Sequence, residues 1–131
     1  MRALVTGATG CVGANIVEAL LARGDTVRAL RRATSRLDAL AGLSFESVTG
    51  DVTDEASLPA AMDGCDVVFH AAAISQYWRS QPDVIYHVNV TGTRNVLRAA
   101  LAQGVKRVIF TSSVAVLGLS LIHISEPTRP Y

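Results

Sequence analysis

The stretch TGATGCVG at residues 6–13 constrains the fold most, because it places three glycines between the short run RALVT and an amphipathic segment. Gly7 is expected to let the chain turn sharply, Gly10 leaves room for a phosphate group near the backbone, and Gly13 lets the next helix pack close to a sheet. Free N–H groups at the helix N-terminus favour an anion here. The predicted residues of this phosphate site are Gly7, Ala8, Thr9, Gly10, Cys11, Val12 and Gly13. The alternative is a tight strand–helix turn that binds no ligand.

Short apolar runs alternate with segments of helical periodicity along residues 1–118. Runs such as VVF and VIF are apolar on both faces, as strands covered by helices on both sides require. Because crossovers between parallel strands are right-handed, we expect an α/β fold with a doubly wound parallel sheet of the Rossmann type, incomplete at five strands. The pattern predicts strands at residues 2–7, 26–31, 44–50, 66–73 and 106–113, and helices at 11–23, 35–41, 57–62 and 83–102.

The composition favours one packed globular domain, since half of the 131 residues are hydrophobic and 18% are charged. A net charge of +1 and a basic cluster of only Arg28, Arg31 and Arg32 argue against a nucleic-acid partner. Polar residues interrupt the uncharged run 108–125, so no membrane span is expected. The N-terminus lacks the apolar segment of a signal peptide, which predicts a cytoplasmic location with both cysteines reduced.

Five motifs follow one another along residues 1–118: the glycine turn, GDVTD at 50–54, HAAA at 70–73, NVTGT at 89–93 and FTSSVAVLG at 110–118. With these motifs and the spacing Gly-x-x-Gly-x-x-Gly, the chain resembles the extended short-chain dehydrogenase/reductases, the NAD-dependent epimerase/dehydratase family. It is most similar to the dihydroflavonol-reductase-like branch, which includes the hopanoid-associated sugar epimerases. The resemblance implies that residues 1–118 are the N-terminal part of a dinucleotide-binding domain.

The resemblance also implies roles for residues outside the glycine turn. Asp51 would face the adenine amino group, and Val52 would face the adenine ring. Asn89 would be a structural residue. Ser113 would be the catalytic serine that bonds the substrate oxygen, the alternative being a plain hydroxyl at the end of the strand. Thr111 would bond the cofactor or simply end the strand. The exit of the fourth strand would run beneath the cofactor, and the residues expected there are Ala71, Ala72 and Ala73.

Two arginines, Arg31 and Arg32, occupy the end of the second predicted strand. An NAD site usually carries Asp or Glu at this place, to hold the ribose 2′-hydroxyl. Here Asp25 precedes the strand and Asp38 follows well after it. A guanidinium suits a phosphate, and a carboxylate would repel it, so the sequence favours NADP over NAD as the cofactor. The alternative is that both arginines belong to a solvated loop.

The resemblance implies hydride transfer between a nicotinamide and a carbonyl or carbinol carbon of a small-molecule substrate. In that family a Tyr moves the proton, and a Lys four residues later lowers its pKa. No Tyr-x-x-x-Lys pair occurs in the 131 residues, and the scattered histidines have no metal-ligand spacing. The prediction is therefore an inactive cofactor-binding fragment of a reductase or epimerase, with a non-catalytic dinucleotide sensor as the alternative. The substrate and the oligomeric state stay open.

The final segment, residues 119–131, does not continue the pattern of the preceding strand. Residues 119–129 can be encoded without a mismatch by a DNA string that resembles the adapter of transposon-based sequencing libraries. We therefore expect residues 119–131 to be a non-native tail. The alternative is a genuine C-terminal peptide, since its serine and prolines are ordinary loop residues.

Overall fold

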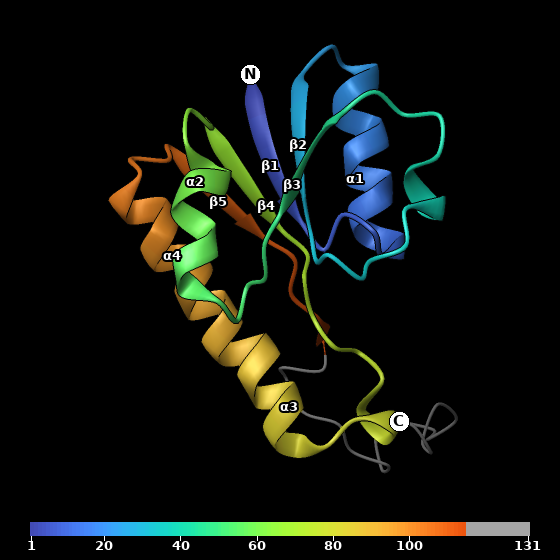
Figure 1. The fold of residues 1–131 in the computed structure, drawn as a ribbon, viewed down its shortest axis with the longest axis vertical. Helices are drawn as coiled ribbons and strands as arrows, with labels where there is room; N and C mark the ends of the chain where they lie inside the picture. The colour runs from blue at the N-terminus through green and yellow to red at the C-terminus, as the bar shows by residue number, and fades with distance from the viewer. Residues whose placement is uncertain (115–131) are drawn as a thin grey trace, which may run out of the picture.

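Five parallel strands form the centre of the molecule in a computed structural model that describes residues 1–114 (Figure 1). Their order across the sheet is β3-β2-β1-β4-β5, and every neighbouring pair is parallel. This arrangement confirms the predicted α/β class and the five-stranded sheet. The strands are β1 (Arg2–Thr6), β2 (Thr26–Arg31), β3 (Glu46–Thr49), β4 (Val67–His70) and β5 (Arg107–Phe110).

Helices cover both faces of the sheet, which confirms the doubly wound arrangement (Figure 1). Helix α1 (Cys11–Ala22) packs on one face, where Val17 and Leu20 join a buried cluster with Ala3, Val5 and Val27. Helices α2 (Leu58–Met62) and α4 (Thr93–Ala102) cover the other face. The buried residues of that second layer include Leu4, Leu58, Met62, Val68 and Val96.

The predicted helix at residues 35–41 is wrong, because only a single 3₁₀ turn (Asp38–Leu40) forms there. Leu40 is the one residue of this turn that is buried, so the segment has no apolar face that could hold a longer helix against the sheet. The helix predicted at residues 57–62 begins as a 3₁₀ turn (Glu55–Ser57) and continues as α2. Pro59 lies in the first turn of α2, as expected.

The long helix predicted at residues 83–102 contains a π-helical segment. Helix α3 (Pro82–Tyr86) leads into π-helical residues His87–Gly92, and these lead into α4. Gly92 packs against Val52, and a Cβ atom at Gly92 would lie 2.8 Å from Val52 Cγ2. Hydrophobic periodicity cannot distinguish such a segment from an α-helix. The two differ in their backbone hydrogen bonds, which run from i to i+5 in the π-helix, and one short π-helical segment leaves the apolar pattern of the sequence unchanged.

Arg28 is not part of a surface basic cluster, because its side chain is buried beneath the C-terminal end of α2. Its Nη1 donates to the carbonyl oxygens of Ala61 (2.7 Å) and Asp63 (3.0 Å), and its Nη2 pairs with Glu46 at 3.0 Å. Arg28 thus satisfies carbonyls that the short helix α2 leaves without a partner. Of the three arginines that lie close together in the sequence, only Arg31 and Arg32 remain accessible at the end of β2.

Strand β5 is an edge of the sheet among the described residues, with Ile109 40% exposed and Phe110 52% exposed. The predicted tail at residues 119–131 lies outside the described residues. Within residues 1–114, no helix is long and apolar enough to cross a membrane.

Candidate functional site

The carboxyl ends of four strands converge on a cavity of about 370 Å³. Three residues of the glycine turn line it, together with the end of β2 (30–32), the exit of β3 (50–53) and the exit of β4 (71–74). The crevice outside the carboxyl ends of parallel strands is where open α/β sheets bind ligands. The structure therefore brings together segments that the sequence separates by more than sixty residues.

The glycine turn contains two glycines that the fold requires and one that it does not. Gly7 has φ +68°, and a Cβ atom there would lie 2.6 Å from the backbone nitrogen of Ala72. A Cβ atom at Gly13 would overlap the carbonyl of Gly7, so the absence of a side chain at Gly13 lets α1 pack closely against the turn. At Gly10 the nearest atom would be Gly7 O at 3.4 Å, an ordinary contact. Protein packing thus gives no reason for a glycine at residue 10.

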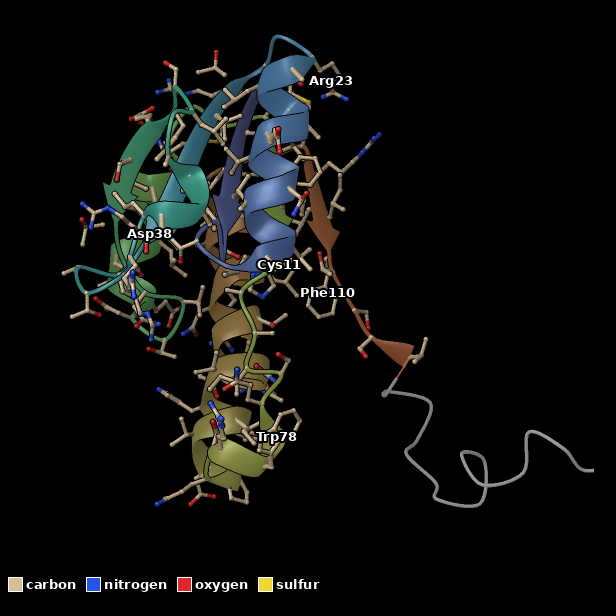
Figure 2. All side chains as sticks on the ribbon, turned by 90° about the vertical axis from the view of Figure 1, so that its right-hand side faces the viewer. Cys11, Arg23, Asp38, Trp78 and Phe110 are labelled. Atoms are coloured by element: carbon tan, nitrogen blue, oxygen red, sulfur yellow. The ribbon has the colours of Figure 1, made fainter. Side chains whose placement is uncertain are left out.

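The start of α1 faces this turn and offers backbone donors. Gly10 is the N-cap residue, and no side chain caps the helix. The first backbone N–H groups of an α-helix have no partner inside the helix, and they attract anions. Cys11, labelled at the start of α1 in Figure 2, is exposed. Val12 is also exposed and Ala8 is buried, and none of these three residues lines the cavity. Of the predicted turn residues, Gly7, Thr9 and Gly10 do line it.

Asp51 lines the cavity with a carboxylate that the backbone holds in place. Its Oδ1 accepts from the backbone N–H of Thr53 (2.9 Å) and from the Thr53 hydroxyl (2.8 Å). The backbone N–H of Asp51 donates to Ser57 Oγ at 3.1 Å. Thr53 is a cavity residue that the sequence analysis missed, although an Asp followed two residues later by a hydroxyl-bearing residue is typical of this turn. The Asp51 carboxylate is therefore oriented before any ligand arrives.

Val52 joins the cavity to the core. It is 6% exposed, lines the cavity, and packs in the layer beneath α2 and α4. Asn95 on α4 donates from Nδ2 to the carbonyl oxygen of Val52 at 3.0 Å. This buried amide, which the sequence analysis did not single out, fixes the exit of β3 against α4.

Both predicted arginines lie at the cavity. Arg31 is half-buried and donates from Nε to Ser47 Oγ at 2.8 Å, while Arg32 is exposed. The Arg32 backbone is held by Ser35, which accepts from its N–H through Oγ (3.1 Å) and donates to its carbonyl (3.0 Å). Ser35 is a further lining residue that the sequence analysis missed.

The two carboxylates near β2 in the sequence do not reach the cavity. Asp25 pairs with the N-terminal amine at 3.1 Å, and hydrogen bonding from Arg23 holds the pKa of its carboxyl below the ordinary value. Asp38 pairs with Arg36 at 2.7 Å. The end of β2 at the cavity is therefore cationic.

The exit of β4 forms one wall of the cavity and is fixed by hydrogen bonds from two sides. All three predicted alanines at residues 71–73 line the cavity, and so does Ile74. The N–H of Ala72 donates to Thr6 Oγ1 at 3.3 Å. The Asn89 amide accepts from the N–H of Ile74 (2.7 Å) and donates to its carbonyl (3.0 Å). These two hydrogen bonds of the Asn89 amide fix the exit of β4. His87 and Val88 also line this side.

The two predicted residues after β5 lie apart from the cavity. Thr111 and Ser113 are both exposed and do not line it. The N–H of Thr111 donates to the carbonyl of His70 at 3.0 Å, so Thr111 extends the pairing of β5 with β4. Within residues 1–114, no group of three or more His, Cys, Asp or Glu side chains is placed to hold a metal ion.

Comparisons with known proteins agree with this geometry. The family model described as "NAD dependent epimerase/dehydratase family" matches residues 3–131. The chain is 47% identical over 115 residues to a "Putative dihydroflavonol 4-reductase" of Synechocystis sp., covering 88% of the chain and 33% of that protein. It is 43% identical over 120 residues to "Sterol demethylase protein B" of Methylococcus capsulatus, covering 92% and 37%. The chain thus spans about a third of the length of these relatives.

Solved structures show the same fold. A UDP-galactose 4-epimerase superposes with a TM-score of 0.81 at 34% identity, covering 90% of this chain and 40% of that one. A short-chain dehydrogenase/reductase superfamily protein from Agrobacterium tumefaciens, solved with bound NAD, gives a TM-score of 0.76 at 37% identity, covering 90% and 34%.

Proposed function

This chain belongs to the NAD dependent epimerase/dehydratase family, and from that premise we propose that residues 1–118 form the cofactor-binding part of an NAD(P)-dependent oxidoreductase or epimerase. The observation that carries the proposal is the cavity at the carboxyl ends of the strands. Gly10 lines this cavity although protein packing does not require a glycine there. It leaves space next to the start of α1, whose backbone N–H groups have no side-chain cap. A diphosphate needs both the space and the donors.

The lining residues suit a dinucleotide, and each segment of the cavity would hold one part of it. The backbone of Gly7, Thr9 and Gly10 would bind the diphosphate, and the pre-oriented Asp51 carboxylate would accept from the adenine amino group. The wall at residues 71–74 would lie along the cofactor. When bound, the nicotinamide would supply or accept a hydride at a carbonyl or carbinol carbon of the substrate.

The proposed substrate is a small molecule with a ketone or a secondary alcohol. Relatives of this chain include proteins named as a dihydroflavonol reductase and as 3 beta-hydroxysteroid dehydrogenases, and similar structures include UDP-sugar epimerases. We propose that Ser113 bonds the substrate oxygen as charge develops on it. The exposed position of Ser113 beyond β5 supports a role toward a substrate and not in the core.

Gly10→Ala is expected to weaken binding of NADP(H) and NAD(H) by about tenfold or more, because its methyl group would occupy space meant for the diphosphate. Stability should fall by only about 0.5–1 kcal/mol, the preference of a helix N-cap for Gly over Ala, since the Cβ atom meets no atom closer than 3.4 Å. Titration of the 131-residue chain with NADPH and NADH, followed by cofactor fluorescence, measures the first effect. Chemical unfolding measures the second.

Ala19→Ser, on the exposed side of α1, serves as the matched control because it alters the same helix away from the turn. It should bind both cofactors as the wild type does. The proposal fails if Gly10→Ala binds as tightly as the wild type, or if the wild-type chain binds neither cofactor.

We propose further that the cofactor is NADP, because Arg31 and Arg32 lie at the cavity where an NAD site would carry an acid. Arg32→Ala is expected to weaken NADPH binding by about tenfold and to leave NADH binding unchanged, since a charged hydrogen bond contributes roughly 1.5–3 kcal/mol. Arg36→Ala is the control, because Arg36 is exposed, pairs with Asp38 and lies outside the cavity lining. Tighter binding of NADH than NADPH by the wild type would contradict the proposal.

A further inference from the structure

His70 is a buried polar side chain that the proposed function leaves without a role. It ends β4 and is 1% exposed. Its Nδ1 lies 2.7 Å from Thr6 Oγ1, and its Nε2 lies 2.9 Å from Thr93 Oγ1. The ring also stacks on Phe110, with centroids 5.5 Å apart. The imidazole therefore connects the end of β1 to the start of α4 through the interior.

The direction of each hydrogen bond follows from counting protons. Thr93 has one hydroxyl hydrogen, and it donates this to the carbonyl oxygen of Asn89 at 2.7 Å. His70 Nε2 must then be the donor to Thr93 Oγ1. A neutral imidazole has one N–H, so Nδ1 accepts from the Thr6 hydroxyl, whose oxygen accepts in turn from Ala72 N–H. One ordered chain of hydrogen bonds results, and it requires neutral His70 with the proton on Nε2.

Both ends of this chain reach the same wall of the cavity. One end is the N–H of Ala72, a lining residue. The other end is Asn89, whose side-chain amide holds both backbone groups of Ile74. The backbone of Gly7 lies so close to this wall that a Cβ atom would fall 2.6 Å from Ala72 N. A displacement of residues 71–74 would therefore also displace the glycine turn, which is the proposed binding site of the diphosphate.

We propose that His70 is a positioning residue that fixes the wall at residues 71–74 against the glycine turn, through Thr6 on one side and Thr93 on the other, and thereby sets the affinity for the dinucleotide. The inference rests on the proposed cofactor function, since it concerns how tightly that cavity binds. His70 acts through its neighbours and does not itself line the cavity.

The test compares His70→Leu with Val68→Ala in the full 131-residue chain. Val68 lies two residues earlier on the same face of β4 and is fully buried, so its truncation destabilises the same strand without removing a hydrogen bond to the wall. Both variants are titrated with NADPH under conditions in which unfolding curves show them folded. His70→Leu is expected to bind about tenfold more weakly than the wild type, and Val68→Ala within about threefold.

Thr6→Val gives a second test that preserves the shape of the side chain in case His70→Leu does not fold. It removes the acceptor of Ala72 N–H, so it should weaken NADPH binding and speed hydrogen exchange of the Ala72 amide. The Thr6→Val/His70→Leu double variant should bind little worse than the worse single variant, because both changes break one chain. Additive losses, or weakening of equal size in Val68→Ala, would overturn the inference.

Ring nitrogen shifts of His70 at pH 7 give a readout that does not depend on the cofactor. The structure requires the proton on Nε2, so the opposite tautomer would overturn the inference. The wild-type titration separates the two proposals. Absence of NADPH and NADH binding by the wild type overturns the proposed function and this inference with it, whereas wild-type binding with unchanged affinity in His70→Leu and Thr6→Val overturns the inference alone.

Discussion

Gly13→Ala is expected to destabilise the folded chain by about 3 kcal/mol or more. A Cβ atom at residue 13 would overlap the Gly7 carbonyl and come within 2.8 Å of the Ala8 Cα atom. Both neighbours are backbone, so neither can rotate away as a side chain would. Relief requires α1 to move off the turn, and α1 carries Val17 and Leu20 of the core beneath it. Urea unfolding followed by far-UV circular dichroism measures the loss.

Gly10→Ala is the matched control for this prediction, because it adds the same methyl group three residues earlier in the same turn. It should lower the free energy of unfolding far less than Gly13→Ala does, while it weakens cofactor binding by about tenfold or more. The pair separates a glycine required by packing from a glycine kept for a ligand. Equal stability of Gly13→Ala and Gly10→Ala would show that the helix does not pack against the turn as described.

Acidification from pH 6.5 to about 4 is expected to cost the wild-type chain about 3 kcal/mol of stability through His70 alone. Burial lowers the pKa of His70 from 6.5 to about 4. Above pH 6.5 the imidazole is neutral in both the folded and the unfolded chain, so stability does not depend on its titration. As the pH falls below 6.5, His70 binds a proton in the unfolded chain but stays neutral in the folded chain until about pH 4. The free energy of unfolding therefore decreases over this range.

Unfolding free energies measured at intervals between pH 7 and pH 4.5 test this prediction. His70→Leu should be less stable at pH 7 and should lose most of the pH dependence, while His87→Gln, which removes an exposed imidazole, should keep it. Three ion-paired carboxyls have pKa values below their ordinary 3.8 or 4.5, so they contribute mainly at lower pH; they are Asp25, Glu46 and Asp66. A flat wild-type profile in this window would contradict the burial of a neutral His70.

The sheet and the glycine turn could be predicted from the sequence because each depends on a local signal. The apolar run VVF indicates a strand buried on both faces, and it forms β4 between β1 and β5, whereas the similar run VIF forms β5 at an edge of the sheet among the described residues, where Ile109 and Phe110 are exposed. The helix predicted at 35–41 was wrong because apolar periodicity over seven residues is weak evidence for a helix, and Leu40 is the one residue of its 3₁₀ turn that packs in the core. The π-helical segment ends at Gly92, which packs against Val52, forty residues away in sequence.

The candidate site could be predicted less completely than the fold. Most of the cavity residues at the ends of β1, β2, β3 and β4 were predicted, since their order along the chain follows the strand exits, but Leu30, Gly50 and Ile74 were missed. Thr53 and Ser35 were missed because their role is to hold Asp51 and the Arg32 backbone, and such support depends on distances that a sequence does not contain. The burial of Arg28 was missed for the same reason, since its partners are carbonyls of a helix thirty residues later.

The central position of β1 has a consequence for synthesis on the ribosome. Ala3 pairs with Val27 on one side and with Val67 on the other, so β1 lacks its second neighbour until 64 more residues have followed it. At about 5–20 residues per second, this interval lasts roughly 3 to 13 s. During it, an apolar strand with one open edge is exposed to other nascent chains. The strand order that creates the cavity thus also sets how long one edge of β1 stays unpaired during synthesis.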